Sequence, residues 1–182
     1  MGNRLGHGPV LVLTGFMGAG KSTIGRAVAQ RLGVDFLDTD AELERSAGRS
    51  VAEVFAAEGE AGFRELERTI VTSVLAGFPG VVALGGGSVT VPAIRGALEG
   101  HRVVHLRITP AVGYARVEQS DRPLLAVDDP HAEYARLLQE RTALYEQVAT
   151  ETVDADRAVQ DVVDDVLAIV HRPPTDRKGP ES

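Results

Sequence analysis

Short apolar runs alternate along the chain with longer segments in which apolar residues recur every three or four positions. The runs are typical of buried strands, and the periodic segments are typical of helices that pack one face on a sheet. The predicted strands span residues 9–14, 34–37, 81–84, 103–108 and 152–153. Because strands and helices alternate, we expect an α/β fold: a parallel sheet covered by helices on both faces, with the functional site at the carboxyl ends of the strands.

The predicted helices carry their own start and stop signals. Apolar residues recur every four positions over 24–32, and Gly33 is placed to end this helix in the left-handed conformation. Ser50 opens a capping box, so a second helix is expected to begin there, break at Gly59 and resume over 63–75. Three further helices are expected at 109–117, where Thr109 and Pro110 suit an N-cap and a first turn, at 137–148 and at 159–170.

The length and composition fit one folded domain. With 182 residues, of which 43% are hydrophobic and 25% charged, the chain can fill a core and still present a polar surface. Residues 172–182 are polar and rich in proline. We therefore expect a single domain over 1–171, followed by a disordered tail over 172–182.

Charge and cysteine content exclude several classes of function. The net charge is −7, so nucleic acid and anionic membrane surfaces are not expected partners. The chain has no cysteine, which excludes disulfides, thiol nucleophiles and thiolate zinc sites. No apolar run is long enough to cross a bilayer and no secretory signal opens the chain, so we expect a cytoplasmic protein. Only two of the 19 basic residues are lysines, which draws attention to Lys21.

The segment from Gly15 to Ser22 fits the phosphate-loop pattern Gly-x4-Gly-Lys-Ser/Thr. It follows a predicted strand and precedes a predicted helix, which is the context that the pattern requires. Its backbone N–H groups and the helix start favour phosphate oxygens, Lys21 can bridge the outer phosphates, and Ser22 can ligate Mg²⁺. The residues expected to contact ATP here are Gly18, Ala19, Gly20, Lys21, Ser22 and Thr23.

Acidic residues follow the second predicted strand. The third strand ends in glycines, so an acid on the magnesium side must come from elsewhere, and Asp38 and Asp40 are the best candidates. We expect Asp38 to face the water shell of the metal and Asp40 to face a substrate. The alternative is that Asp38-Thr39-Asp40 only caps the following helix. A GTPase is excluded because Asn-Lys-x-Asp is absent, which leaves a small kinase or a nucleotide-binding module without chemistry.

Two arginines and a glycine run suit a second ligand that carries a carboxylate and hydroxyls. Arg64, Gly85 to Gly87 and Arg141 can converge at the carboxyl edge of the sheet. The arginine guanidinium matches a carboxylate, and an exposed glycine backbone can approach a ligand closely. Taken singly, each arginine is also compatible with a solvated helix residue, and the glycines with a flexible turn.

Together these motifs resemble the shikimate kinase family. The resemblance runs from about Val10 to Val170, in order and at similar spacing. The motifs that carry it are Gly15–Thr23, Asp38-Thr39-Asp40, Gly48-Arg49-Ser50, Gly59-Glu60-x-x-Phe63-Arg64-x-x-Glu67, Gly85-Gly86-Gly87, Arg122-Pro123-Leu124-Leu125 and Arg141-x-x-x-Tyr145.

The resemblance implies the three-layer P-loop fold of nucleoside-monophosphate kinases, with a five-stranded parallel sheet. It also implies transfer of the ATP γ-phosphate to the 3-hydroxyl of shikimate, with Mg²⁺ as cofactor and these two small molecules as substrates. We expect the protein to be a monomer. Residues 1–171 would form the kinase domain, with shikimate-binding helices within 41–76 and a lid at 118–130.

The resemblance also assigns roles to single residues. It implies that Lys21, Asp40 and Arg122 are catalytic, that Arg122 belongs to the lid, and that Ser22 and Asp38 hold the metal. Shikimate is expected to contact Asp40 through its hydroxyls, Arg64 and Arg141 through its carboxylate, and the backbone of Gly85, Gly86 and Gly87. Arg116 and Arg157 correspond to positions that flank the adenine.

Two rival functions stay open from the residues alone. Another small-metabolite kinase of the same architecture, for example one that acts on gluconate, would also need groups for a carboxylate and hydroxyls. A nucleotide-dependent module without catalysis would need the phosphate loop but not both aspartates and Arg122.

Overall fold

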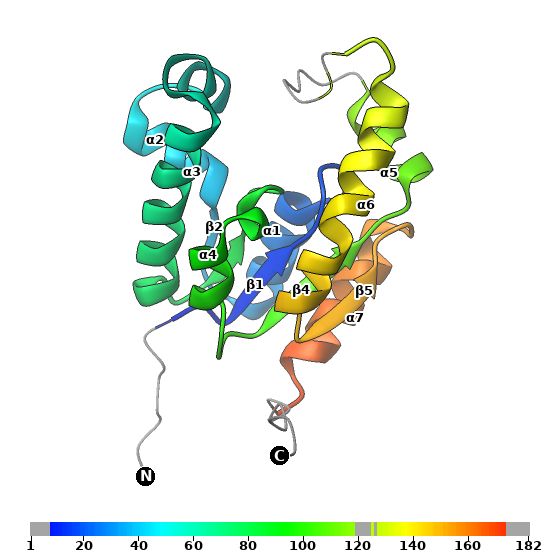
Figure 1. Cartoon of the computed structure of the whole chain (residues 1–182). Coiled ribbons are helices and arrows are strands. Elements are labelled where there is room, and N and C mark those ends of the chain that lie inside the picture. The colour runs from blue at the N-terminus through cyan, green and yellow to red at the C-terminus, as the bar shows by residue number, and fades with distance from the viewer. Residues whose placement is uncertain (1–7, 119–124, 126, 174–182) are drawn as a thin grey trace, which may run out of the picture.

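The computed structural model describes residues 8–118, 125 and 127–173 (Figure 1). Its five strands form one parallel sheet, as predicted, and their order is β2-β3-β1-β4-β5. The strands are β1 (Leu11–Thr14), β2 (Phe36–Asp38), β3 (Val81–Ala83), β4 (Val103–Arg107) and β5 (Glu151–Asp154). The second strand begins later than the predicted 34–37, so that Asp38 is its last residue.

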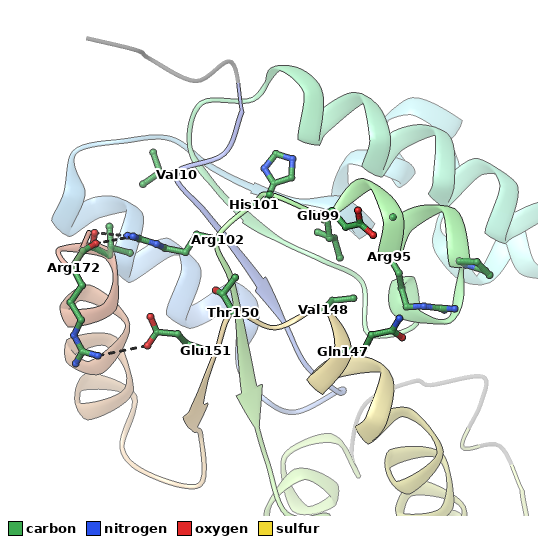
Figure 2. A pocket seen from close by; sticks show the side chains of 15 residues that line it. Val10, Arg95, Glu99, His101, Arg102, Gln147, Val148, Thr150, Glu151 and Arg172 are labelled. Carbon is green, nitrogen blue, oxygen red and sulfur yellow. Dashed lines mark hydrogen bonds and ion pairs between the residues drawn. The ribbon is translucent and has the colours of Figure 1, made fainter. Parts of the chain in front are cut away.

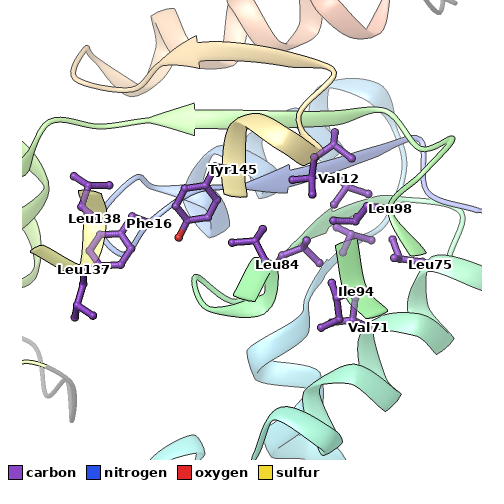
Figure 3. Packing of buried hydrophobic residues seen from close by; sticks show 14 of the residues in the cluster. Val12, Phe16, Val71, Leu75, Leu84, Ile94, Leu98, Leu137, Leu138 and Tyr145 are labelled. Carbon is purple, nitrogen blue, oxygen red and sulfur yellow. The ribbon is translucent and has the colours of Figure 1, made fainter. Parts of the chain in front are cut away.

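The helices lie on both faces of the sheet. They are α1 (Lys21–Leu32), α2 (Thr39–Ala47), α3 (Val51–Gly77), α4 (Pro92–Ala97), α5 (Pro110–Val117), α6 (Pro130–Val148) and α7 (Val159–Val170), with a 3₁₀ turn η1 at Ser88–Thr90. Side chains alternate between the faces, so Leu11 and Leu13 pack under α1 and α7. Val12 packs with α3, α4 and α6 on the opposite face (Figure 3). The strands read as continuous apolar runs because both faces are covered.

The predicted helix signals act as expected at three points. Gly33 ends α1 with φ 68°, and its N–H donates to the carbonyls of the last turn. Ser50 and Glu53 form the capping box that begins α3. Gly59 has φ 69° and ψ −178° and interrupts that helix, which continues to Gly77. Glycine suits this break because other residues rarely adopt positive φ.

Other local features differ from the prediction. No helix was predicted over 88–98, where η1 and α4 connect β3 to β4. These elements are too short to show a helical period, and Pro92 is their main start signal. Helix α5 begins at Pro110 as expected, but the Thr109 side chain makes no capping bond. Its backbone N–H donates instead to Asp156 Oδ1 at 3.0 Å.

Two predicted segments fall largely outside the described residues. Most of the lid at 118–130, including Arg122, and the tail from 174 onward are not described. Within the residues that are described, no helix is long and apolar enough to span a membrane.

Candidate active site

Side chains from three helices bind the carbonyl groups of the phosphate loop between β1 and α1. Lys21 Nζ donates to the Gly15 carbonyl at 2.8 Å and to the Phe16 carbonyl at 3.2 Å. The Tyr134 hydroxyl donates to the Met17 carbonyl at 2.7 Å, and Arg116 Nη1 donates to the Gly18 carbonyl at 3.1 Å. A carbonyl and the next N–H point in opposite directions across a trans peptide. Binding the Met17 carbonyl from outside therefore orients the N–H of Gly18 away from α6.

The start of α1 is open to an anion. The N-cap is Gly20, which has φ 85°. Because glycine has no side chain, no side-chain oxygen caps the first turn, and that turn holds no acidic residue. The first N–H groups of a helix lack partners within the helix and lie at the positive end of its dipole. Gly18 also has φ +85°, and a Cβ there would lie 2.6 Å from the Gly113 carbonyl oxygen. The loop therefore requires glycine at this position.

Asp38 joins β2, α2 and the phosphate loop. Its Oδ1 accepts from the N–H groups of Asp40 (2.9 Å) and Ala41 (3.3 Å), which caps α2. Its Oδ2 accepts a hydrogen bond from the Ser22 hydroxyl. The capping role and contact with the phosphate loop thus occur together in one side chain.

The Ser22 hydroxyl and the Asp38 carboxylate are oxygen donors of the kind that Mg²⁺ prefers, and they touch each other. They therefore fit a magnesium ion. The described residues contain no group of three or more His, Asp or Glu side chains that could hold a metal. A magnesium ion bound here would complete its coordination with phosphate and water oxygens, which is usual for this metal.

A cavity of about 420 Å³ lies beside the phosphate loop. It brings together several residues that were predicted to share a site. Its lining consists of Met17, Gly18, Gly20, Lys21, Ser22, Thr23, Asp38, Asp40, Leu84, Gly86, Arg116 and Val117. Phosphate-binding, metal-binding and acceptor-binding candidates therefore meet at the carboxyl ends of β1, β2 and β3.

A larger cavity of about 1080 Å³ lies at the other end of the sheet (Figure 2). Its lining includes Val10, Arg102 and Thr150, which directly precede β1, β4 and β5. None of the predicted site residues lines it.

The glycine turn after β3 is held closely between α2 and α3. The Gly85 N–H donates to Thr39 Oγ1 at 3.0 Å. A Cβ on Gly85 would lie 2.5 Å from Asp40 Oδ1, and one on Gly87 would lie 2.4 Å from Arg64 Nη2. The absence of side chains therefore allows a carboxylate and a guanidinium to approach the same backbone turn.

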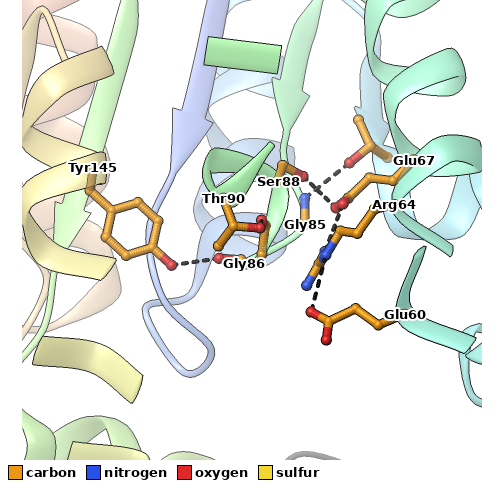
Figure 4. A network of polar contacts seen from close by, with 10 residues as sticks. Glu60, Arg64, Glu67, Gly85, Gly86, Ser88, Thr90 and Tyr145 are labelled. Carbon is orange, nitrogen blue, oxygen red and sulfur yellow. Dashed lines mark hydrogen bonds and ion pairs between the residues drawn. The ribbon is translucent and has the colours of Figure 1, made fainter. Parts of the chain in front are cut away.

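A buried carboxylate orients Arg64 (Figure 4). Glu67 is 2% exposed; its Oε2 lies 2.7 Å from Arg64 Nη1, and its Oε1 accepts from the Ser88 hydroxyl at 2.6 Å. A second carboxylate, that of Glu60, lies 3.7 Å from Arg64 Nε. These contacts fix the guanidinium beside Gly87.

Arg141 is buried without a carboxylate partner among the described residues. It is 8% exposed, and its guanidinium carbon lies 5.3 Å from the centre of the Phe16 ring. One helical turn later, the Tyr145 hydroxyl donates to the Gly86 carbonyl at 2.5 Å (Figure 4). A buried cation with no countercharge has a high desolvation cost, which an anionic ligand would offset.

Two predicted site residues have no place in this cavity that can be stated: Arg157 lies elsewhere, and Arg122 is not described. Arg157 pairs with Asp165 of α7 on the surface and is absent from the cavity lining. Arg122 lies outside the described residues. Their roles stay predictions, as does the adenine contact of Arg116, whose Nη2 donates to the Ala155 carbonyl at 3.1 Å.

Sequence reasoning assigned no role to the residues that support the site from behind. Tyr134 and Ser88 were not singled out, and Glu67 was named only as part of the motif that contains Arg64. Tyr134 contacts Met17, which is 117 positions away, and Ser88 contacts Glu67, which is 21 positions away. Helical spacing offered one signal: Tyr134, Arg141 and Tyr145 are seven and four residues apart, which places them on one helix face.

Comparisons with known proteins agree with this geometry. A shikimate kinase of Mycobacterium marinum is 50% identical over 150 residues, which is 82% of each chain. The solved shikimate kinase of Acinetobacter baumannii, in complex with shikimate, superposes with a TM-score of 0.82 at 36% identity, over 90% of this chain and 92% of that one.

A gluconokinase from Sinorhizobium meliloti is more distant. It reaches a TM-score of 0.56 at 20% identity, over 92% of this chain and 93% of its own, and so shares the fold alone. In contrast, the family model for shikimate kinase matches residues 17–171. The chain belongs to the shikimate kinase family.

Proposed function

We propose that this chain transfers the γ-phosphate of ATP to the 3-hydroxyl of shikimate with the help of Mg²⁺, giving shikimate 3-phosphate and ADP. The observation that carries the proposal is the meeting of the phosphate loop, Asp40 and Gly86 around one cavity, with Arg64 and Arg141 beside it. Family membership and the shikimate named with the solved relative support the same acceptor.

The phosphate loop holds the nucleotide. The uncapped first turn of α1 and the N–H groups from Gly18 to Thr23 receive the phosphate oxygens. Lys21 exchanges its bonds to the Gly15 and Phe16 carbonyls for bonds to the outer phosphates. Arg116 and Arg157 are assigned to the adenine end.

Ser22 and Asp38 hold the magnesium side. When bound, Mg²⁺ supplies charge neutralisation at the phosphate oxygens, which stabilises the transferring group. Asp38 also caps α2 through its other oxygen, so the same side chain fixes the start of α2 beside the metal side of the site.

The acceptor lies against the glycine turn. Arg64 and Arg141 bind its carboxylate, since both guanidinium groups are held in place, one by Glu67 and one over Phe16. The backbone of Gly85, Gly86 and Gly87 lines the ring, and the Asp40 carboxylate binds the hydroxyl that attacks.

Positioning and charge stabilisation perform most of the chemistry of phosphoryl transfer. Asp40 orients the 3-hydroxyl for in-line attack and accepts its proton. Lys21 and the lid residue Arg122 balance the charge that develops on the transferring phosphoryl group. Closure of the lid excludes water, which would otherwise compete as acceptor.

We propose that the enzyme acts as a monomer. Its two substrates are small molecules found in the cytoplasm, which is the location we propose for it.

The test is a coupled assay of ADP release with Mg²⁺-ATP and shikimate, gluconate or no acceptor. We expect release that depends on both Mg²⁺ and shikimate, with phosphorus NMR placing the new ester on the 3-oxygen. Equal ADP release with and without acceptor contradicts the kinase assignment. Faster release with gluconate than with shikimate favours the rival small-metabolite kinase.

A further inference from the structure

Helix α6 presents two buried tyrosines on the face that meets the site. Tyr134 and Tyr145 are both 0% exposed and eleven residues apart, so they lie about three turns from each other on one face. The Tyr134 hydroxyl donates to the Met17 carbonyl in the phosphate loop at 2.7 Å. The Tyr145 hydroxyl donates to the Gly86 carbonyl in the glycine turn at 2.5 Å. One helix thus contacts the backbone of both ligand-binding loops.

Each bond orients an N–H group as well as a carbonyl. In a planar trans peptide the carbonyl of one residue and the N–H of the next point in opposite directions. Fixing the Met17 carbonyl toward α6 therefore turns the Gly18 N–H away from α6, and fixing the Gly86 carbonyl does the same for Gly87. Since glycines rotate freely about their backbone angles, these peptides need an external contact to keep one orientation.

The structure keeps both hydroxyls in place. Tyr134 meets the Phe16 ring edge-on at 4.9 Å, and its hydroxyl occupies the space that a side chain on Gly113 would fill, 1.9 Å from the Cβ position. The Tyr145 ring stacks on His105 at 5.0 Å and 22°. Burial lowers the pKa of His105 to about 4, so the imidazole that packs on Tyr145 is neutral.

Both hydroxyls remain donors at every pH at which the enzyme would work. Burial raises the pKa of Tyr134 and of Tyr145 above the ordinary value for tyrosine, although nearby arginines act in the opposite direction.

We propose that Tyr134 and Tyr145 are positioning residues for separate substrates: Tyr134 sets the phosphate loop for ATP, and Tyr145 sets the glycine turn for the acceptor. Neither hydroxyl needs to touch a substrate. The inference rests on the proposed function, because it takes the occupants of the two loops from it.

The test compares Tyr134→Phe and Tyr145→Phe, each of which removes a single hydroxyl. Tyr134→Phe should raise the KM for ATP about three- to tenfold, the range expected for one neutral hydrogen bond, and leave the KM for shikimate unchanged. Tyr145→Phe should raise the KM for shikimate by a similar factor and leave the KM for ATP unchanged. Tyr114 is the third tyrosine of the chain, and its hydroxyl makes no hydrogen bond within the described residues. Tyr114→Phe is therefore the matched control, with both KM values unchanged.

Two further variants displace the hydroxyls without removing them. Gly113→Ala places a methyl group where the Tyr134 hydroxyl lies, and His105→Ala removes the ring that supports Tyr145. We expect the first to raise the KM for ATP selectively and the second to raise the KM for shikimate selectively. Thermal unfolding of all variants shows whether each still folds.

A purely structural role would alter both KM values together or lower only the melting temperature. Either of these outcomes overturns the proposal, and so does loss of folding in both Phe variants. Failure of the wild-type chain to phosphorylate shikimate would instead count against the proposed function. Normal wild-type turnover with unchanged constants in both Phe variants counts against the positioning role alone.

Discussion

The two ends of the sheet both carry buried or half-buried arginines but use them differently. At the amino end, the two Nη groups of Arg102 donate to the carbonyls of Val170 (2.6 Å) and Arg172 (2.8 Å), where α7 ends. Arg95 likewise donates to the Val89 carbonyl at 2.7 Å. At the carboxyl end, Arg141 stacks on Phe16 with no carboxylate beside it among the described residues.

The difference teaches that cavity size is a poor guide to function in this molecule. The amino-end cavity is the larger, at about 1080 Å³ against 420 Å³. However, two of its arginines, Arg95 and Arg102, are bonded to backbone carbonyls, and the third, Arg172, lies 3.7 Å from the Glu151 carboxylate. At the carboxyl end the helix start is uncapped and a buried cation lacks a countercharge. Such groups gain most from an anionic ligand.

The largest effect that would test this comparison is expected from Lys21→Ala. Lys21 is half-buried, and its Nζ donates to two carbonyls of the phosphate loop. Loss of its charge beside the phosphates should lower kcat by about 10³-fold or more, with the fold intact. Steady-state ADP release and circular dichroism measure the two quantities. An unfolded variant would show that Lys21 serves the core.

A second large effect is expected from Arg122→Ala in the lid. An arginine that meets the transferring phosphoryl group stabilises the transition state more than the ground state. We expect kcat to fall by about 10³-fold while the KM of each substrate changes little, because Lys21 and Mg²⁺ remain. A near-normal kcat, or a defect confined to the KM for ATP, would mean that Arg122 only anchors the lid.

An intermediate effect is expected from Arg141→Ala. A charge-assisted bond contributes about 1.5–3 kcal/mol, so shikimate affinity should fall about ten- to a hundredfold while ATP affinity is unchanged. Calorimetric titration with each substrate measures both affinities.

Arg64→Ala should weaken shikimate binding similarly, and it should also destabilise the fold because it leaves the buried Glu67 carboxylate without its cation. Unchanged shikimate binding in both variants removes the carboxylate clamp.

The smallest catalytic effect is expected at the amino end, from Arg102→Ala. Its loss removes two bonds at the end of α7, which costs about 1–2 kcal/mol after solvent screening and lowers Tm by about 2–8 °C. Kinetic constants should not change. A marked rise in either KM would break the comparison, because it would tie the amino-end cavity to catalysis.

The sequence was informative where function depends on neighbouring residues. The phosphate loop is one continuous motif between a strand and a helix, so its residues and their element could be predicted together. Asp38 could be placed because strands of a parallel sheet end at a common edge. In both cases the local pattern and the global fold lead to the same position.

Residues that act through distant contacts could not be found this way. Tyr134 and Met17 are 117 positions apart, and Ser88 and Glu67 are 21 apart. Their contacts depend on how α6 and α3 pack on the sheet, and no local spacing encodes that packing. Short elements such as α4 were missed for another reason: six residues hold too few turns to show a period.

The contacts of Lys21 bear on how the phosphate loop keeps its shape. Its ammonium group bridges the carbonyls of Gly15 and Phe16, which ties the start of α1 back to the start of the loop. Part of the shape of the loop is therefore fixed by contacts within the chain. On the proposed function, ATP binding exchanges the carbonyl oxygens around the Lys21 nitrogen for phosphate oxygens. A loop transplanted into another scaffold would keep this property only if the lysine moved with it.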